Sequence, residues 1–282
     1  MPVIDGVTYI SSTRMPAHGE NSSPYLILRL LLGTLNLEIN NKKFRQLKNF
    51  LPLQPIQQSK TNSQAVDEFL KQFGIPTSAV FVRNTLSDNR PFYRDLLAEY
   101  AQYFFQTERS SHVSAFVFLY RILERISYSF PLLYCSVATE YSATYDLLKK
   151  FFAEAGGDLS FFKKFLQETK FVDKLLLDAT YDLAFFSQNG NAQDYYKAVT
   201  KIYNDFADQD KNQRAVKIKF RNMSEFMVTL RNRFLHARTG DGQANILVSQ
   251  IKNPEEFFAQ MNPLFVGFLA YITLQILGKK YA

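Results

Sequence analysis

A chain of 282 residues that is 46% apolar, with 27 Phe and 16 Tyr, can bury a substantial core, which excludes an intrinsically disordered protein. Cys135 is the only cysteine, so an internal disulfide and a cysteine-based metal site are both excluded, and a reducing cytoplasmic location is expected. The first residues show no basic stretch followed by an apolar run, so no secretion signal is predicted, and the formal net charge of +7 favours an anionic partner.

Residues 1–90 are predicted to form a small mixed α/β region with a docking or regulatory role. The run Thr34–Asn40 alternates strictly between polar and apolar residues, which is typical of a strand. The other expected features are a polar, turn-rich start over 1–22, a proline-containing loop over 51–62, a short helix over 63–73 and a short strand over 79–82.

From Pro91 onward the apolar residues recur with a helical period, so an all-α helical bundle is predicted for residues 91–282. Pro131 is expected to end or kink a helix. The most apolar stretch, residues 264–277, is shorter than the roughly 20 residues of a membrane span, so it predicts a buried C-terminal helix and no membrane partner. The expected helices cover 91–107, 112–130, 132–154, 158–169, 171–187, 192–208, 217–238 and 254–278.

The last but one of these helices carries Arg231, Asn232 and His236 in the spacing Arg-Asn-x-x-x-His. This motif resembles that of the HEPN superfamily, helical domains whose active members carry an Arg and a His with four to six residues between them. The resemblance implies a metal-independent endoribonuclease without cofactors, of the kind found among bacterial toxins and antiphage effectors, with two motifs meeting in a homodimer. Many toxin members have a tyrosine two residues after the His; here Arg238 stands there, so regulation through that tyrosine is not carried over.

On a helical projection, Glu225, Thr229, Asn232 and His236 fall within about 60° of one another and form a polar stripe between apolar residues. Such a stripe is expected to face a cleft or another polar surface, with Glu225 and Thr229 as supporting residues. Arg231 lies about 140° from His236 on the same projection, so a composite site across a two-fold axis is favoured.

These residue types can cut RNA without a metal ion. One His236 would take the proton of a ribose 2′-hydroxyl while a second protonates the leaving 5′-oxygen, since a pKa near 6.5 allows both roles. Arg231 would stabilise the negative charge of the transition state, and Asn232 would orient His236 or bind the phosphate.

Positive charge is concentrated around the motif. Residues 211–238 hold eight basic side chains and one acidic side chain, Glu225. The net charge of this segment is therefore as large as the net charge of the whole protein. A basic segment beside a catalytic motif favours RNA as the partner. The expected RNA-binding residues are Lys217, Lys219, Arg221, Arg233 and Arg238.

Other interpretations remain open. His236 would cap the C-terminal end of its helix in a catalytically silent helical adaptor, and the stripe and basic segment would then form an interface within a larger defence complex. The polar groups of helix 112–130, Tyr120 among them, are interpreted as a packing or dimer face. A third, membrane-attacking effector would use the helix 264–277. A nuclease effector would also need restraint, which implies a regulatory or sensor protein as a further partner.

Overall fold

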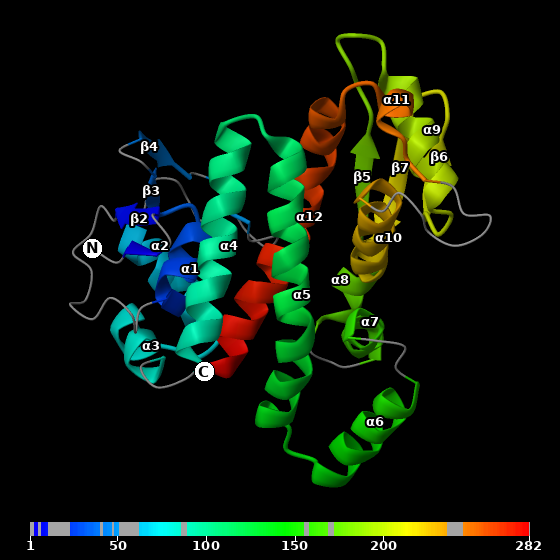
Figure 1. The fold of residues 1–282 in the computed structure, drawn as a ribbon. Helices are drawn as coiled ribbons and strands as arrows, with labels where there is room; N and C mark the ends of the chain where they lie inside the picture. Colours follow the sequence, from blue (N-terminus) through cyan, green and yellow to red (C-terminus); the bar gives the residue numbers. More distant parts are fainter. Residues whose placement is uncertain are drawn as a thin grey trace. The chain divides into compact units, whose positions relative to one another are not determined.

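The computed structural model describes residues 3–4, 7–10, 23–39, 42–46, 48–50, 62–85, 89–154, 158–168, 172–235 and 245–281 (Figure 1). Most of these residues are helical, as the sequence predicts, and strands are few. The chain divides into two compact units, formed by residues 1–109 with 269–282 and by residues 110–268. Helix α12 (Pro254–Lys280) contributes to both units, since the division at Leu269 falls within it.

The division differs from the sequence boundary at residue 90, because helix α4 (Arg90–Glu108) belongs to the first unit. Every residue of α1 (Ser23–Leu31) is buried, and α4 packs against it more extensively than the short helix Ser78–Asn84 does. An apolar helix of this kind has to be covered by another element, and its own sequence does not say which one.

The first unit holds an antiparallel sheet in the order β1-β2-β3-β4. Strand β3 (Asn36–Ile39) confirms the alternating run, while the polar start of the chain contributes β1 (Val3–Ile4) and β2 (Val7–Ile10), which the sequence did not predict. Strand β4 (Lys42–Arg45) completes the sheet. The loop expected over 51–62 falls almost entirely outside the described residues.

Two short helices follow in this unit. Helix α2 (Asn62–Lys71) confirms the predicted helix. The strand expected over 79–82 is wrong, because these residues form α3 (Ser78–Asn84). Thr77 caps this helix by accepting a hydrogen bond from the Val80 amide at 3.4 Å, so the cap overrides the strand preference of a run of β-branched and aromatic residues.

The second unit begins with long helices. Helix α5 (His112–Val137) runs through Pro131, so the predicted helix over 132–154 is really the end of α5 followed by α6 (Tyr141–Glu154). Phe130, directly before the proline, packs between Phe162 and Phe165 of α7 (Asp158–Glu168), with ring centroids 5.4 and 5.6 Å apart. These contacts hold α5 against α7 next to the proline, where the helix lacks one backbone hydrogen bond.

The prediction of an all-α domain fails between residues 174 and 222. Helix α8 (Lys174–Asp178) is followed by β5 (Thr180–Ala184), and α9 (Ala192–Ile202) is followed by β6 (Asp208–Asp210) and β7 (Ala215–Lys219). The three strands form an antiparallel sheet in the order β5-β7-β6. Val216 and Ile218 are buried and Lys217 is exposed, so β7 has the period of a strand, not of a helix.

After the sheet, a 3-10 turn (Phe220–Asn222) leads into α10 (Met223–Leu235), and α11 (Val248–Ile251) precedes α12. Aromatic rings join α10 and α12 in the core of this unit. The ring centres of Phe226 and Phe265 lie 5.6 Å apart, and those of Phe234 and Phe258 lie 4.8 Å apart. These contacts fix the face that α10 turns toward the core and therefore the direction of its polar residues.

Among the described helices, α12 alone is long and apolar enough to cross a membrane, and 78% of its most apolar window is buried within the protein. The predicted buried C-terminal helix is therefore present, and it begins at Pro254. A helix covered in this way is consistent with a soluble protein.

Candidate functional site

Helix α10 carries the part of the motif that the structure describes. Its apolar residues Phe226, Met227 and Leu230 are buried, which anchors one side of the helix in the core. The predicted polar residues Glu225, Thr229, Arg231, Asn232 and Arg233 are all half-buried. They therefore lie at the edge of the surface that α10 packs against the core.

Arg231 and Asn232 lie in direct contact. The Nη1 atom of Arg231 donates to the Oδ1 atom of Asn232 at 3.0 Å, although the two residues point about 100° apart on a helical projection. The length of the arginine side chain closes this gap. The structure thus links Arg231 to the polar stripe within a single chain.

Arg231 also packs against Tyr120 of α5. Its guanidinium carbon lies 4.9 Å from the centre of the Tyr120 ring, which is only 7% exposed. Burial raises the pKa of the Tyr120 phenol, the positive charge of Arg231 opposes this rise and Glu124 adds to it. The phenol is thus neutral at physiological pH and serves as a flat surface beneath the guanidinium group.

Glu225 forms an ion pair with Lys163 of α7, through its Oε2 atom and the lysine Nζ atom. This contact ties the start of α10 to α7 and leaves Glu225 with a clear structural role. Thr229 is half-buried on the same helix.

His236 and Arg238 fall outside the described residues, which end at Leu235 and resume at Asn245. The chain returns to α10 directly after this gap, because the Ile246 amide donates to the Arg233 carbonyl at 2.9 Å. Leu247 is the residue directly before α11, so the start of α11 is tied to the last turn of the motif helix.

The basic segment is less concentrated in space than in sequence. Lys217 on β7 is paired in register with Asp182 on β5 and Asp208 on β6, and its Nζ atom lies 4.0 Å from a carboxylate oxygen of each. Arg221 forms an ion pair with Asp178 of α8. These contacts favour a structural role for Lys217 and Arg221, while Lys219 lies half-buried on β7.

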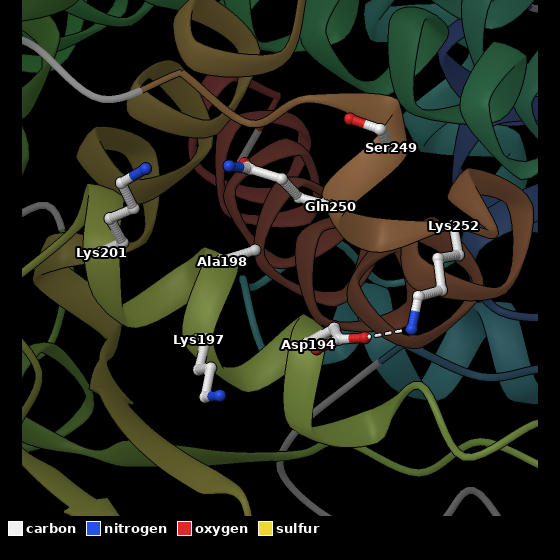
Figure 2. A pocket seen from close by; sticks show the side chains of 7 residues that line it. All are labelled: Asp194, Lys197, Ala198, Lys201, Ser249, Gln250 and Lys252. Atoms are coloured by element: carbon white, nitrogen blue, oxygen red, sulfur yellow. Dashed lines mark hydrogen bonds and ion pairs between the residues drawn. The ribbon is translucent and has the colours of Figure 1, made fainter.

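A second polar site lies between α9 and α11, and sequence reasoning missed it. A groove of about 370 Å³ is lined by Asp194, Lys197, Ala198, Lys201, Ser249, Gln250 and Lys252 (Figure 2). The only sequence signal for it is the spacing of Lys197 and Lys201, which places both on one side of α9.

Within the part of the chain that the structure describes, no three His, Cys, Asp or Glu side chains are grouped so as to hold a metal ion. No protein-family model, curated protein or solved structure matches the chain. Functional inference therefore rests on the motif, its contacts and the chemistry of the surrounding side chains.

Proposed function

We propose that this chain is a metal-independent endoribonuclease effector of HEPN type, acting in the cytoplasm as a bacterial toxin or antiphage defence protein. Its site is formed by Arg231, Asn232 and His236. The observation that carries the proposal is the arrangement of Arg231, which stacks on Tyr120 and donates to Asn232 five residues before His236.

This arrangement supports phosphate chemistry because an arginine that is already stacked and hydrogen-bonded loses little freedom when it binds an anion. Asn232 accepts from Arg231 through its oxygen, so its amide nitrogen is the group it offers as a donor to RNA or to His236. Tyr120 holds the guanidinium group over its ring, and the N–H groups of the guanidinium are the donors that would contact a phosphate.

In the proposed reaction, His236 takes the proton from a ribose 2′-hydroxyl, and the 2′-oxygen attacks the adjacent phosphorus. The bond to the 5′-oxygen breaks, and a second His236, from a homodimer partner, donates a proton to that oxygen. The products carry a 2′,3′-cyclic phosphate and a 5′-hydroxyl. DNA lacks the 2′-hydroxyl and is not cut.

The test is cleavage of total RNA by the purified chain in EDTA. Wild type is compared with His236→Ala, Arg231→Ala and Lys149→Ala, the last changing an exposed lysine on α6 as a control. Cleavage by wild type and the control alone, leaving cyclic-phosphate ends, supports the proposal. Cleavage that survives both motif substitutions contradicts it.

A restrained enzyme needs a second measurement, because a regulatory or sensor partner keeps such a nuclease silent. The same variants are therefore expressed in bacteria, and growth and RNA integrity are followed. Toxicity lost with His236→Ala supports a latent nuclease. Toxicity that is absent, or unchanged by that substitution, favours the adaptor.

The alternative function, a catalytically silent adaptor in a larger defence complex, is favoured by one observation. Around the turn from α5 to α6, Leu132, Tyr141 and Tyr145 are 68%, 87% and 66% exposed. Exposed aromatic and aliphatic side chains of this size suit a protein interface. The adaptor would keep its function after His236→Ala and lose it when these three residues are made polar.

A further inference from the structure

The polar side chains among the described residues that line the groove between α9 and α11 are mainly hydrogen-bond donors. Its lysines Lys197, Lys201 and Lys252 carry three positive charges, and Ser249 adds a hydroxyl. Gln250 accepts a hydrogen bond from the Leu247 amide through its Oε1 atom, so the amide nitrogen is the donor it has left. A surface of this composition is complementary to an anion.

Asp194, the one acidic side chain among the described residues that line the groove, is already paired. Asp194 lies 2.8 Å from the Nζ atom of Lys252 (Figure 2), and this contact, with the charges of Lys252 and Lys197, lowers its pKa below the usual range of a carboxyl. Lys252 sits at φ 58, a backbone conformation that glycine adopts at lower cost. The chain thus carries a lysine at a strained position, where Asp194 holds it.

Lys197 and Lys201 are exposed and form no ion pair with another described residue. They lie four residues apart on α9, a spacing at which like charges destabilise a helix by a few tenths of a kcal/mol. In Figure 2 the ammonium groups of Lys197, Lys201 and Lys252 stand apart around the groove instead of converging on one point. Separated positive charges suit successive phosphates of a strand better than a single phosphate ion.

The lining also indicates which part of a nucleic acid is bound. None of the described residues that line the groove is aromatic, so this lining offers no surface on which a base would stack. Its cations are lysines, which act as point charges without the forked geometry that arginine uses to recognise a base edge. Binding through such a groove depends on the phosphate backbone and not on base sequence.

We propose that the groove between α9 and α11 binds the phosphate backbone of an RNA strand and so holds the substrate beside the motif. This inference rests on the proposed function, because it takes RNA as the polyanion. The link to the motif is the hydrogen bond from the Ile246 amide to the Arg233 carbonyl, which ties the start of α11 to the last turn of α10. The lysines of the groove would thus contact RNA in place of Lys217 and Arg221, which form ion pairs within the protein.

The test measures binding of a fluorescent single-stranded 2′-O-methyl RNA oligonucleotide to the full chain at several salt concentrations. Lys197→Gln/Lys201→Gln is compared with Lys71→Gln/Lys149→Gln, which removes two exposed lysines on α2 and α6. The groove variant is expected to bind about tenfold more weakly at low salt. Its slope of log affinity against log salt should fall by about 1.4, while the control keeps both values. Circular dichroism confirms that both variants are folded.

An equal loss of affinity in the two variants, or no loss in the groove variant, overturns the proposal. A preference of more than about tenfold for one homopolymer over another also overturns it, because backbone binding is insensitive to base. ATP and inorganic phosphate are titrated separately. If ATP binds more tightly than the oligonucleotide and the groove variant loses it, the groove is a nucleotide site and the RNA assignment fails.

The two proposals fail in distinguishable ways, because a 2′-O-methyl strand cannot be cut through its 2′-oxygen. A wild type that binds the strand through the groove, but neither cleaves RNA nor shows toxicity that His236→Ala removes, contradicts the proposed function and leaves the groove proposal standing. A wild type that cleaves RNA while the groove variant binds normally contradicts the groove alone.

Discussion

The guanidinium carbon of Arg231 lies 4.9 Å from the centre of the Tyr120 ring, so the first residue of the motif on α10 rests on an aromatic residue of α5. The two residues are far apart in sequence, and Tyr120 is almost fully buried. The ring therefore limits where Arg231 can place its hydrogen-bond donors. Tyr120 is a positioning residue in this arrangement, since it acts through Arg231.

Tyr120→Leu removes the ring face under Arg231, while Tyr120→Phe retains it. A cation–π contact contributes about 0.5–2 kcal/mol, so we expect Tyr120→Leu to lower the RNA cleavage rate by about two- to thirtyfold. Tyr120→Phe should cleave nearly as wild type does. Thermal unfolding of both variants separates this effect from a loss of stability. Equal rates for the two variants would show that the ring does not position Arg231.

Glu225 and Lys163 should matter for stability and not for cleavage. Their side chains are 39% and 31% exposed, and ion pairs of this kind contribute less than about 1 kcal/mol. We expect Glu225→Gln to lower the free energy of unfolding by that amount, with no further loss when Lys163→Met is added. RNA cleavage should stay unchanged. A large fall in the cleavage rate at unchanged stability would instead place Glu225 in the reaction.

Long helices could be predicted from the sequence because their apolar period extends over several turns. Helix α4 and helix α12 are found close to their expected ranges. The sheet in the second unit could not be predicted in this way. Strand β7 spans only Ala215–Lys219, too few residues for its alternation to stand out beside the helical pattern of α10, and it depends on β5 for its pairing.

The same limit applies to charge. Residues 211–238 are strongly basic when their charges are counted along the sequence. In the sheet, however, strand pairing places Asp182 and Asp208 on either side of Lys217, and their negative charges offset its positive charge. The motif could be found in the sequence because its residues are close together. The contact of Arg231 with Tyr120 and the groove between α9 and α11 could not, because each joins segments that only folding brings together.

The Tyr195–Glu256 contact makes stability depend on pH at both ends of the scale. Tyr195 donates to the Oε2 atom of Glu256, and Ser187 donates to the same atom at 2.8 Å. The hydrogen bond from Tyr195 lowers the pKa of Glu256, while burial and the contact with Glu256 raise the pKa of Tyr195 to about 12. Glu256 therefore stabilises the fold above its unfolded pKa, and this contribution is lost as the pH falls through the lower folded value.

For Tyr195 the sign is reversed. Its contribution is complete below its unfolded pKa of about 10 and is lost as the pH rises toward the folded value of about 12. We expect Tyr195→Phe to lower the melting temperature at neutral pH and to flatten its decline at both extremes. Tyr196→Phe, which changes the next residue on α9, is the control. Melting curves across the pH range that decline equally in both variants would contradict this account.

Two glycines of α12 should respond to alanine in opposite directions. In a helix, Gly→Ala gains about 1 kcal/mol through backbone entropy, provided that the added methyl group has space. A Cβ atom at Gly267 meets nothing within 4 Å, so Gly267→Ala is expected to raise the free energy of unfolding by up to that amount.

A Cβ atom at Gly278 would lie 2.6 Å from ring atoms of Phe73, whose ring packs 5.1 Å from that of Phe69. Overpacking of this kind costs about 1–3 kcal/mol, so Gly278→Ala should be net destabilising in urea unfolding, and Phe73→Leu should restore the loss in part. Equal gains at both glycines would mean that the Phe73 ring moves aside at little cost.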